Sequence, residues 1–339
     1  MVLLNFVFDH PILVLLFPIL VLVVMFIYYD PPRRTRHASR DQFSAAKIKT
    51  PSATFEMIPT NGIHLHTLCA GDPANPLVIL LHGFPEFWKA WELQVDDLVN
   101  SGFYVMVPDQ RGYNLSSKPL NMGDYKITTL VQDIIGLVDY AKRDKVYLAG
   151  HDWGAVIAWY LAMLHPDRFH KLLVVNGTHS KVFAAAYKHD KDQYKKSGYM
   201  RLFQIPFIPQ RVIARNDFAI FTKGPKSIVE TARPGAFSEE DIKAYKLAWH
   251  DPGTINCMLN WYRARFQKSP KLEDSQWLVK IPVQIVWGTA DPVLKFEMAG
   301  KCLNYCKNGK LEPIEGATHW VLHEEPKKVS KIMIDFFKS

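Results

Sequence analysis

Asp152 lies where its carboxylate could act as a nucleophile. It is the middle residue of the stretch Gly150–Gly154, which reads Gly-His-Asp-Trp-Gly. The apolar run Val146–Ala149 before it predicts a buried strand, and residues 155–164 after it predict a helix that stops at His165 and Pro166. A strand, a tight turn flanked by glycines and a helix form a nucleophile elbow, which exposes the central side chain. Glycines are expected in so crowded a turn because it needs backbone freedom that side chains would block.

The elbow motif usually contains serine, and an aspartate there changes the reaction. A serine alkoxide attacks a carbonyl carbon, whereas a carboxylate forms an ester by attacking a saturated carbon that is strained or activated. The electrophiles that suit Asp152 are therefore an epoxide carbon or a carbon that bears a halogen, and a serine esterase is excluded. A Gly-x-Asp-x-Gly sequence also occurs by chance in ordinary strand-to-helix turns, so the rest of the chain must supply the partners.

Two residues further along the chain complete a triad with Asp152. An elbow nucleophile is followed in sequence by an acid and then by a histidine. Asp291 follows the apolar run Val283–Trp287, and His319 follows the last predicted strand. Parallel strands bring their carboxyl ends to one edge of the sheet, so we expect the three side chains to meet there. His323 is a second candidate base, but it lies about a turn further on, in the next predicted helix.

The backbone could supply the donors that hold an oxyanion. In an elbow these donors are the N–H of the residue after the nucleophile and an N–H from the loop after an earlier strand. Trp153 occupies the first position. Phe84 occupies the second, within the stretch His82–Glu86, which reads His-Gly-Phe-Pro-Glu. The apolar side chains do not matter for this role because the backbone donates.

Five segments together resemble the epoxide hydrolases of the α/β-hydrolase family, over about residues 50–339. These segments are, in chain order, His82–Glu86, Asp109–Tyr113, Gly150–Gly154, and the positions of Asp291 and His319. With its apolar N-terminus the chain looks most like the membrane-anchored, single-domain animal members (epoxide hydrolase 3/4-like). One departure is Asn114, where the family usually continues its Arg-Gly-Tyr sequence with glycine.

The resemblance implies a reaction and the residues that perform it. In the family two cap tyrosines hydrogen-bond the epoxide oxygen, and the matching segments here contain Tyr199 and Tyr262, with Tyr194 as an alternative to Tyr199. The implied reaction opens a lipophilic epoxide, such as a fatty-acid epoxide, to a vicinal diol through an ester on Asp152. It requires no cofactor and no metal. The residues expected to line the substrate pocket are His82, Pro85, His151, Trp261 and Trp320.

Three other functions remain open. A haloalkane dehalogenase would use Asp152, Asp291 and His319 in the same roles. It would use Trp153 as a halide contact, but it often has asparagine at the position of Phe84 and needs no proton-donating tyrosines. A fluoroacetate-type dehalogenase is expected to have arginine in place of Trp153. A ligand-binding relative without activity usually has a broken triad, and this triad is intact.

Parallel strands that alternate with helices must position these residues. Continuous apolar runs of five or so residues predict strands buried in a parallel sheet. The predicted parallel strands are Leu77–Leu81, Tyr104–Pro108, Val146–Ala149, Lys171–Val175, Val283–Trp287 and Lys310–Ile314. Before them, two alternating segments joined by Asn61-Gly62 predict a hairpin. The fold class is therefore α/β, with the mostly parallel, helix-flanked sheet of the α/β-hydrolase fold.

An interruption of this alternation predicts an inserted cap. Residues 177–280 contain no buried-strand run, are rich in aromatic residues and begin with a group of lysines. We predict a mainly helical cap over this segment, between a first part of the core at 51–176 and a second part at 281–339. The lysines suit either a solvated helix face or a membrane contact.

Residues 1–30 predict a transmembrane helix that anchors the chain. Residues 11–29 are uninterrupted by charge and match the ~20 residues of a bilayer span. A cleaved signal peptide is the alternative, but no lysine or arginine precedes the run and no small-x-small site follows it. Residues 31–50 predict a basic juxtamembrane linker. Its arginines place the catalytic part in the cytosol by the positive-inside rule, with the endoplasmic reticulum as the default membrane.

Composition limits the remaining possibilities. The 339 residues include 48% hydrophobic residues, enough for one large core, and the net charge of +8 is moderate. The sequence contains no Gly-rich phosphate loop, and it contains no basic block long enough to indicate a nucleic-acid partner. The glycosylation sequons at Asn114 and Asn176 lie beside the predicted active-site strands, where a glycan would obstruct the fold. Four cysteines without metal-ligand spacing are expected to be free thiols: Cys69, Cys257, Cys302 and Cys306.

Overall fold

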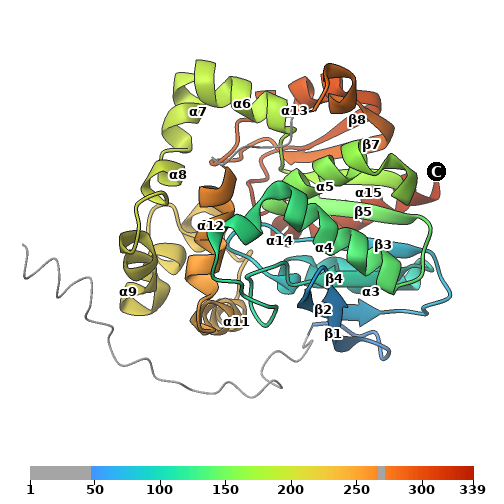
Figure 1. Ribbon diagram of the computed structural model, residues 1–339, viewed down its shortest axis with the longest axis horizontal. Helices are drawn as coiled ribbons and strands as arrows, with labels where there is room; N and C mark the ends of the chain where they lie inside the picture. The colour runs from blue at the N-terminus through green and yellow to red at the C-terminus, as the bar shows by residue number, and fades with distance from the viewer. Residues whose placement is uncertain (1–46, 266–271) are drawn as a thin grey trace, which may run out of the picture.

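A single eight-stranded sheet forms the centre of the computed structural model, which describes residues 47–265 and 272–339 (Figure 1). Its strands are β1 (Thr54–Thr60), β2 (Ile63–Ala70), β3 (Leu77–Leu81), β4 (Tyr104–Pro108), β5 (Val146–His151), β6 (Phe169–Val175), β7 (Val279–Gly288) and β8 (Cys306–Ile314). Their order across the sheet is β1-β2-β4-β3-β5-β6-β7-β8. The β1–β2 and β2–β4 pairs are antiparallel, and the other five pairs of neighbouring strands are parallel. The prediction of a mostly parallel sheet is therefore confirmed.

The sequence pattern of each strand matches its place in the sheet. β3 lies between two parallel neighbours, and all five of its residues are buried. β8 lies at the edge and alternates in exposure along most of its length. A central strand covered on both faces needs a continuous apolar run, whereas an edge strand faces solvent on part of its surface.

Helices cover both faces of the sheet (Figure 1). The helices of the core are α3 (Glu92–Asn100), α4 (Ile127–Tyr140), α5 (Trp153–Leu164), α13 (Glu297–Cys302), α14 (Val321–Glu324) and α15 (Pro326–Lys338). Helix α4 buries Leu130, Ile134 and Leu137 on one face, the spacing of an amphipathic helix. Helix α5 is buried along nearly its whole length, which explains its apolar sequence. Short 3-10 helices lie in the connections: η2 (Trp88–Trp91), η3 (Met122–Tyr125), η4 (Pro166–Arg168), η5 (Asp274–Trp277) and η6 (Leu303–Tyr305).

The chain between β6 and β7 forms a second group of helices, to the left in Figure 1. These are α6 (Ser180–His189), α7 (Lys191–Lys196), α8 (Tyr199–Leu202), α9 (Ile208–Thr222), α10 (Ile228–Thr231), α11 (Glu239–His250) and α12 (Thr254–Arg265). We call this group the cap. Helix α9 has non-helical backbone at residues 215–218. No strand occurs among the described residues of this segment.

Several predictions concern the ends of the chain and its cysteines. The predicted membrane helix at residues 11–29 and most of the linker at 31–50 lie outside the described residues. Within 47–265 and 272–339, no helix is long and apolar enough to cross a bilayer. All four cysteines are free thiols, as predicted.

Candidate active site

Asp152 occupies a sharp turn between β5 and α5. Its backbone has φ 50° and ψ −116°, a conformation that non-glycine residues rarely adopt and that is common at functional sites. The glycines around it supply room. A Cβ atom on Gly83 would lie 2.5 Å from the Asp152 Cβ, and one on Gly154 would lie 2.2 Å from the Leu81 carbonyl oxygen. The strained residue of the turn is thus the aspartate, and its glycine neighbours allow the backbones of β3 and α5 to approach.

The three residues of the predicted triad meet at the carboxyl ends of their strands. The Nδ1 atom of His319 lies 2.8 Å from an Asp291 carboxylate oxygen, and its Nε2 atom lies 3.5 Å from Asp152 Oδ2. His323 instead contacts Glu86 at 2.8 Å. The structure therefore brings together Asp152, Asp291 and His319, and it places the alternative histidine in another network.

Asp291 is held by hydrogen bonds on both of its oxygens. The Asn176 side-chain amide donates to Oδ2 at 2.7 Å, and the backbone N–H groups of Val293 and Leu294 donate to Oδ1 at 2.7 and 2.9 Å. Burial opposes the charged carboxylate, but His319 and these donors outweigh it and lower the pKa of Asp291. The acid is therefore ionised and fixed in orientation. Asn176 and Asn114, the two sequon residues, are both fully buried.

His319 is strongly basic in this resting arrangement. Burial alone would lower its pKa, but the Asp291 and Asp152 carboxylates raise the pKa of His319 to about 10. The imidazole therefore holds a proton at neutral pH. Loss of the charge on Asp152 removes one of these two causes, so the pKa of His319 must then fall.

One backbone donor already contacts the nucleophile. The Phe84 N–H donates a hydrogen bond of 2.9 Å to Asp152 Oδ1. This oxygen would become the carbonyl oxygen of an ester formed through Oδ2, so the donor lies where an oxyanion would develop. Trp153 is the first residue of α5, where backbone N–H groups have no partner within the helix. Its contribution to the oxyanion hole stays a prediction.

Two tyrosines of the cap face the nucleophile. Tyr199 and Tyr262 line the same cavity as Asp152, and their ring centroids lie 5.8 Å apart. Burial raises the pKa of both phenols above the ordinary value, so both remain protonated donors. Tyr194 is 43% exposed and packs against Arg201. The structure thus favours Tyr199 over Tyr194 as the first cap tyrosine.

The five residues predicted to line the substrate pocket lie around the site, buried or nearly so. None of them is among the described residues that line the cavity at Asp152. Their polar atoms have partners elsewhere: His82 with Gly83 and Gln110, Pro85 with Trp249, His151 with Glu86 and the His319 carbonyl, Trp261 with Arg111, and Trp320 with Thr231. They support the loops and strand ends that hold the triad, because each takes part in a hydrogen bond with another segment of the chain.

The cavity is small and is lined mainly by the cap and the elbow. Its volume is about 30 Å³. The lining residues are Asp152, Trp153, Val156, Thr178, Phe183, Tyr199, Met200, Tyr262, Arg265 and Leu294. The sequence interpretation missed Arg265 and Asn176. Arg265 lies three residues after Tyr262, and this helical spacing is a signal that could have identified it.

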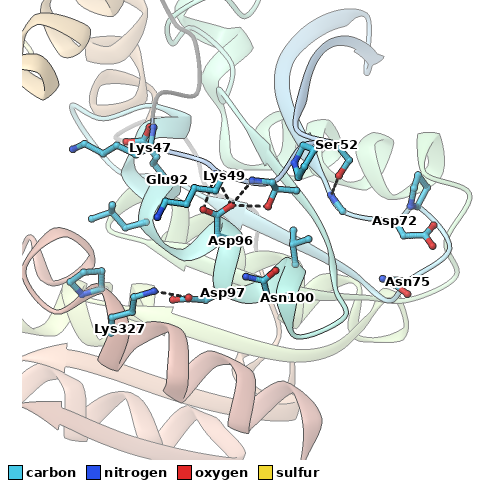
Figure 2. Close-up of a pocket in the computed structure, with 17 residues that line it drawn as sticks. Lys47, Lys49, Ser52, Asp72, Asn75, Glu92, Asp96, Asp97, Asn100 and Lys327 are labelled. Atoms are coloured by element: carbon cyan, nitrogen blue, oxygen red, sulfur yellow. Dashed lines mark hydrogen bonds and ion pairs between the residues drawn. The ribbon is translucent and has the colours of Figure 1, made fainter.

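A larger hollow of about 930 Å³ lies elsewhere, where the described chain begins (Figure 2). Its polar groups are bonded to one another. The Asp96 carboxylate accepts hydrogen bonds from the backbone N–H groups of Lys49 and Thr50, and Lys327 pairs with Asp97. The hollow is open and contains none of the triad residues. We therefore place the chemistry in the smaller cavity, where the nucleophile and its partners converge.

The described residues contain no group of three or more His, Cys, Asp or Glu arranged to hold a metal ion. What the site can do follows from the groups it does contain. It combines a strained carboxylate, a histidine paired with an acid, a backbone donor and two phenols around one cavity. This set suits attack by a carboxylate on a carbon whose leaving oxygen needs a proton.

Comparison with known proteins agrees with this geometry. A family model described as the alpha/beta hydrolase fold matches residues 76–213. The chain is 39% identical over 284 residues to the AB hydrolase superfamily protein YfhM of Bacillus subtilis, which covers 84% of this chain and 98% of that protein. It is 34% identical over 316 residues to epoxide hydrolase 4 of Homo sapiens, which covers 91% of this chain and 85% of that protein.

A solved structure of an epoxide hydrolase is also similar to this chain. The Bacillus megaterium epoxide hydrolase in complex with an inhibitor superposes with a TM-score of 0.75 at 31% identity, over 84% of this chain and 100% of that one. The relatives span nearly the whole described chain and include both the core and the cap. The chain therefore belongs to the epoxide hydrolases of the α/β-hydrolase fold and is an enzyme of that type.

Proposed function

We propose that this enzyme opens lipophilic epoxides to vicinal diols through an ester on Asp152. The observation that supports this best is the hydrogen bond between the Phe84 N–H and Asp152 Oδ1. It orients the carboxylate so that Oδ2 is the oxygen that attacks an epoxide carbon. Tyr199 and Tyr262 donate to the epoxide oxygen and protonate it as the ring opens.

In the second half of the reaction water hydrolyses the ester. Formation of the ester removes the negative charge of Asp152, and the pKa of His319 falls. The imidazolium loses its proton, which restores the phenol that protonated the epoxide oxygen. The neutral imidazole, oriented by Asp291, then removes a proton from water, and the resulting hydroxide attacks the ester carbonyl carbon. The Phe84 N–H, together with that of Trp153, stabilises the oxyanion. The diol leaves and Asp152 is regenerated with one oxygen from water.

A haloalkane dehalogenase is the second candidate because it would share the triad. A halide leaving group needs no proton, so that reaction would give no role to two buried phenols beside the nucleophile. The epoxide hydrolases among the relatives also favour the first candidate.

The test is a single turnover in oxygen-18 water. Purified protein in excess is incubated with styrene oxide, digested, and the peptide that contains Asp152 is weighed. Label in that peptide together with released diol is the expected result, because water attacks the ester carbonyl. Diol without label in the peptide would mean that water attacks the epoxide directly, and the ester mechanism would be wrong. No diol from several epoxides would favour the dehalogenase, and then a ligand-binding protein.

We further propose that residues 11–29 anchor the enzyme in a membrane, with the catalytic part in the cytosol and the endoplasmic reticulum as the membrane. The support is the length and apolarity of this run and the arginines that follow it. A lipophilic substrate, such as a fatty-acid epoxide, would then reach the site from the bilayer. Digestion of the catalytic part by protease added to intact microsomes is the expected result, and protection would contradict this orientation.

A further inference from the structure

Arg265 places a positive charge in the active-site cavity. It is the last residue of α12, and it lines the cavity together with Asp152 and the two cap tyrosines. Its guanidinium lies 4.5 Å from the ring centroid of Phe183 and 5.7 Å from that of Trp153. Cation–π contacts at these distances hold a guanidinium in place and leave its N–H donors free for another acceptor.

The guanidinium has no carboxylate partner among the residues that the structure describes. Among the described residues, no ion pair within 4.0 Å includes Arg265, whereas Arg111 pairs with Asp133 at 2.6 Å. Burial lowers the pKa of Arg265, and the nearby Asp152 opposes this shift. A guanidinium nevertheless remains protonated at neutral pH. A charge that is partly shielded from water and has no carboxylate partner among the described residues is unfavourable, so the site favours an anion beside Arg265.

The reaction itself leaves the positive charge of Arg265 less compensated. In the resting enzyme the Asp152 carboxylate offsets part of the Arg265 charge. Formation of the ester converts that carboxylate to a neutral group. Asp291, the other carboxylate of the triad, is already paired with His319. From that point no described residue is paired with Arg265 as a counter-charge, and the substrate can provide one.

We propose that Arg265 binds a carboxylate of the substrate, and that the preferred substrates are epoxides with a carboxylate close to the ring. This inference rests on the proposed function and specifies its substrate class. Arg265 and Asp152 lie on the wall of the same cavity, so the carboxylate and the epoxide ring that meet them must be near each other in the substrate. A guanidinium suits a carboxylate because its planar fork donates two parallel hydrogen bonds.

The contact favours the transition state over the bound substrate. Before attack, repulsion from the Asp152 carboxylate weakens, without cancelling, the attraction of Arg265 for a substrate carboxylate in the same cavity. This repulsion decreases as Asp152 becomes an ester, while the attraction of Arg265 persists. An interaction that strengthens along the reaction raises kcat as well as affinity.

The experiment compares trans-phenylglycidate with trans-phenylglycidamide, which differ only in the charge of one group. We measure kcat/KM for both in wild type and in Arg265→Met, and we take the acid-to-amide ratio in each enzyme. The amide corrects for the intrinsic reactivity of the ring. The ratio is expected to fall about 10- to 100-fold in Arg265→Met, the range for a hydrogen bond between charged groups. Arg265→Lys, which keeps the charge and loses the fork, is expected to give an intermediate ratio.

A matched control distinguishes the loss of Arg265 from the cavity from the loss of a positive charge elsewhere on the protein. Lys243→Met removes one positive charge from an exposed position of the cap helix α11, and its ratio is expected to equal that of wild type. If Arg265→Met does not fold, as judged by its circular dichroism and thermal unfolding, Arg265→Gln takes its place. An unchanged ratio in the folded variant overturns the inference. An equal loss on both substrates also overturns it, because Arg265 would then act on the nucleophile.

Binding of unreactive analogues tests the inference apart from catalysis. By isothermal titration calorimetry, trans-cinnamate is expected to bind wild type more tightly than trans-cinnamamide, and this preference is expected to disappear in Arg265→Met. Equal affinities in wild type overturn the inference, even when styrene oxide is hydrolysed and the proposed function stands. If no epoxide is hydrolysed but the preference for cinnamate depends on Arg265, the proposed function fails and the carboxylate site remains.

Discussion

The core and the cap hold their halves of the active site by different kinds of contact. In the core, Asp291 accepts three hydrogen bonds besides the one from His319, and the Phe84 N–H holds one oxygen of Asp152. In the cap, aromatic rings surround the functional groups. The ring of Tyr262 lies 5.1 Å from each of the rings of Trp153, Phe84 and Phe203, and Arg265 lies between two rings.

The two kinds of contact suit two tasks: the core positions the reacting atoms, and the cap accommodates the substrate. Hydrogen bonds have preferred distances and angles, so they fix the reacting atoms with the accuracy that covalent catalysis needs. Packing between rings is less directional, so the cap can adjust to a substrate larger than the small cavity. We therefore expect changes in the core to affect catalysis and stability together. Changes in the cap should affect proton donation and the choice of substrate, with less effect on stability.

The largest expected effect follows removal of the nucleophile. Asp152→Ala should lower kcat by about 10⁴-fold or more, because no ester can form. His319→Gln serves as the comparison: it should still form the ester, so diol release stops after the first step and modified peptide accumulates. Rapid-quench kinetics and peptide mass measure both results. Multiple turnovers by Asp152→Ala at a rate near that of wild type would contradict the assignment.

The cap tyrosines test the second half of the comparison. The double variant Tyr199→Phe and Tyr262→Phe should lower kcat about 10²- to 10⁴-fold, the usual contribution of general acid catalysis. Each single variant should lose less, because the other phenol remains. Urea unfolding should show little change in stability, since the rings are retained. Tyr194→Phe is the matched control on the exposed surface, and full activity there with loss in Tyr199→Phe would establish which tyrosine acts.

The pH dependence of stability tests the charge balance of the core. The pKa of His319 is raised from 6.5 to about 10 in the folded protein, so folding is coupled to proton uptake. The stabilisation is therefore complete below pH 6.5 and is lost as the pH rises towards 10. The difference in unfolding free energy between wild type and His319→Gln should decrease by a few kcal/mol over this interval. A difference that stays constant with pH would contradict the raised pKa.

The smallest expected effect concerns the residue that orients the acid. Asn176 donates to Asp291 and accepts a hydrogen bond of 3.1 Å from the Gly288 N–H. Asn176→Ala leaves buried groups without partners, which should destabilise the protein by about 1–3 kcal/mol and lower kcat. Asn304→Ala, at an exposed position, is the control and should change stability by less than about 0.5 kcal/mol. Urea unfolding measures both, and equal effects would show that the buried amide has no special role.

Much of the core could be predicted from local patterns. Strands such as β3 and β5 are buried on both faces, so their apolar runs are continuous and easy to identify. The nucleophile position follows from the strand, turn and helix around Asp152. The positions of Asp291 and His319 follow because the carboxyl ends of parallel strands share one edge of the sheet. The sequence thus indicated the reacting groups, since each of them lies in or directly after a strand that its own sequence pattern predicts.

The residues that lie beside those groups depended on tertiary structure. From the sequence, Tyr194 remains an alternative to Tyr199, and only the packing of the cap exposes Tyr194 and places Tyr199 on the wall of the cavity. Arg265 follows Arg263 in a basic stretch that resembles a solvated helix face. Its burial against Phe183 and Trp153 requires contacts between segments that are far apart in the chain. The sequence by itself determined the fold and the triad, because local periodicity and strand ends specify them. Only the tertiary structure decided which polar side chains share the cavity, because long-range packing sets burial and charge balance.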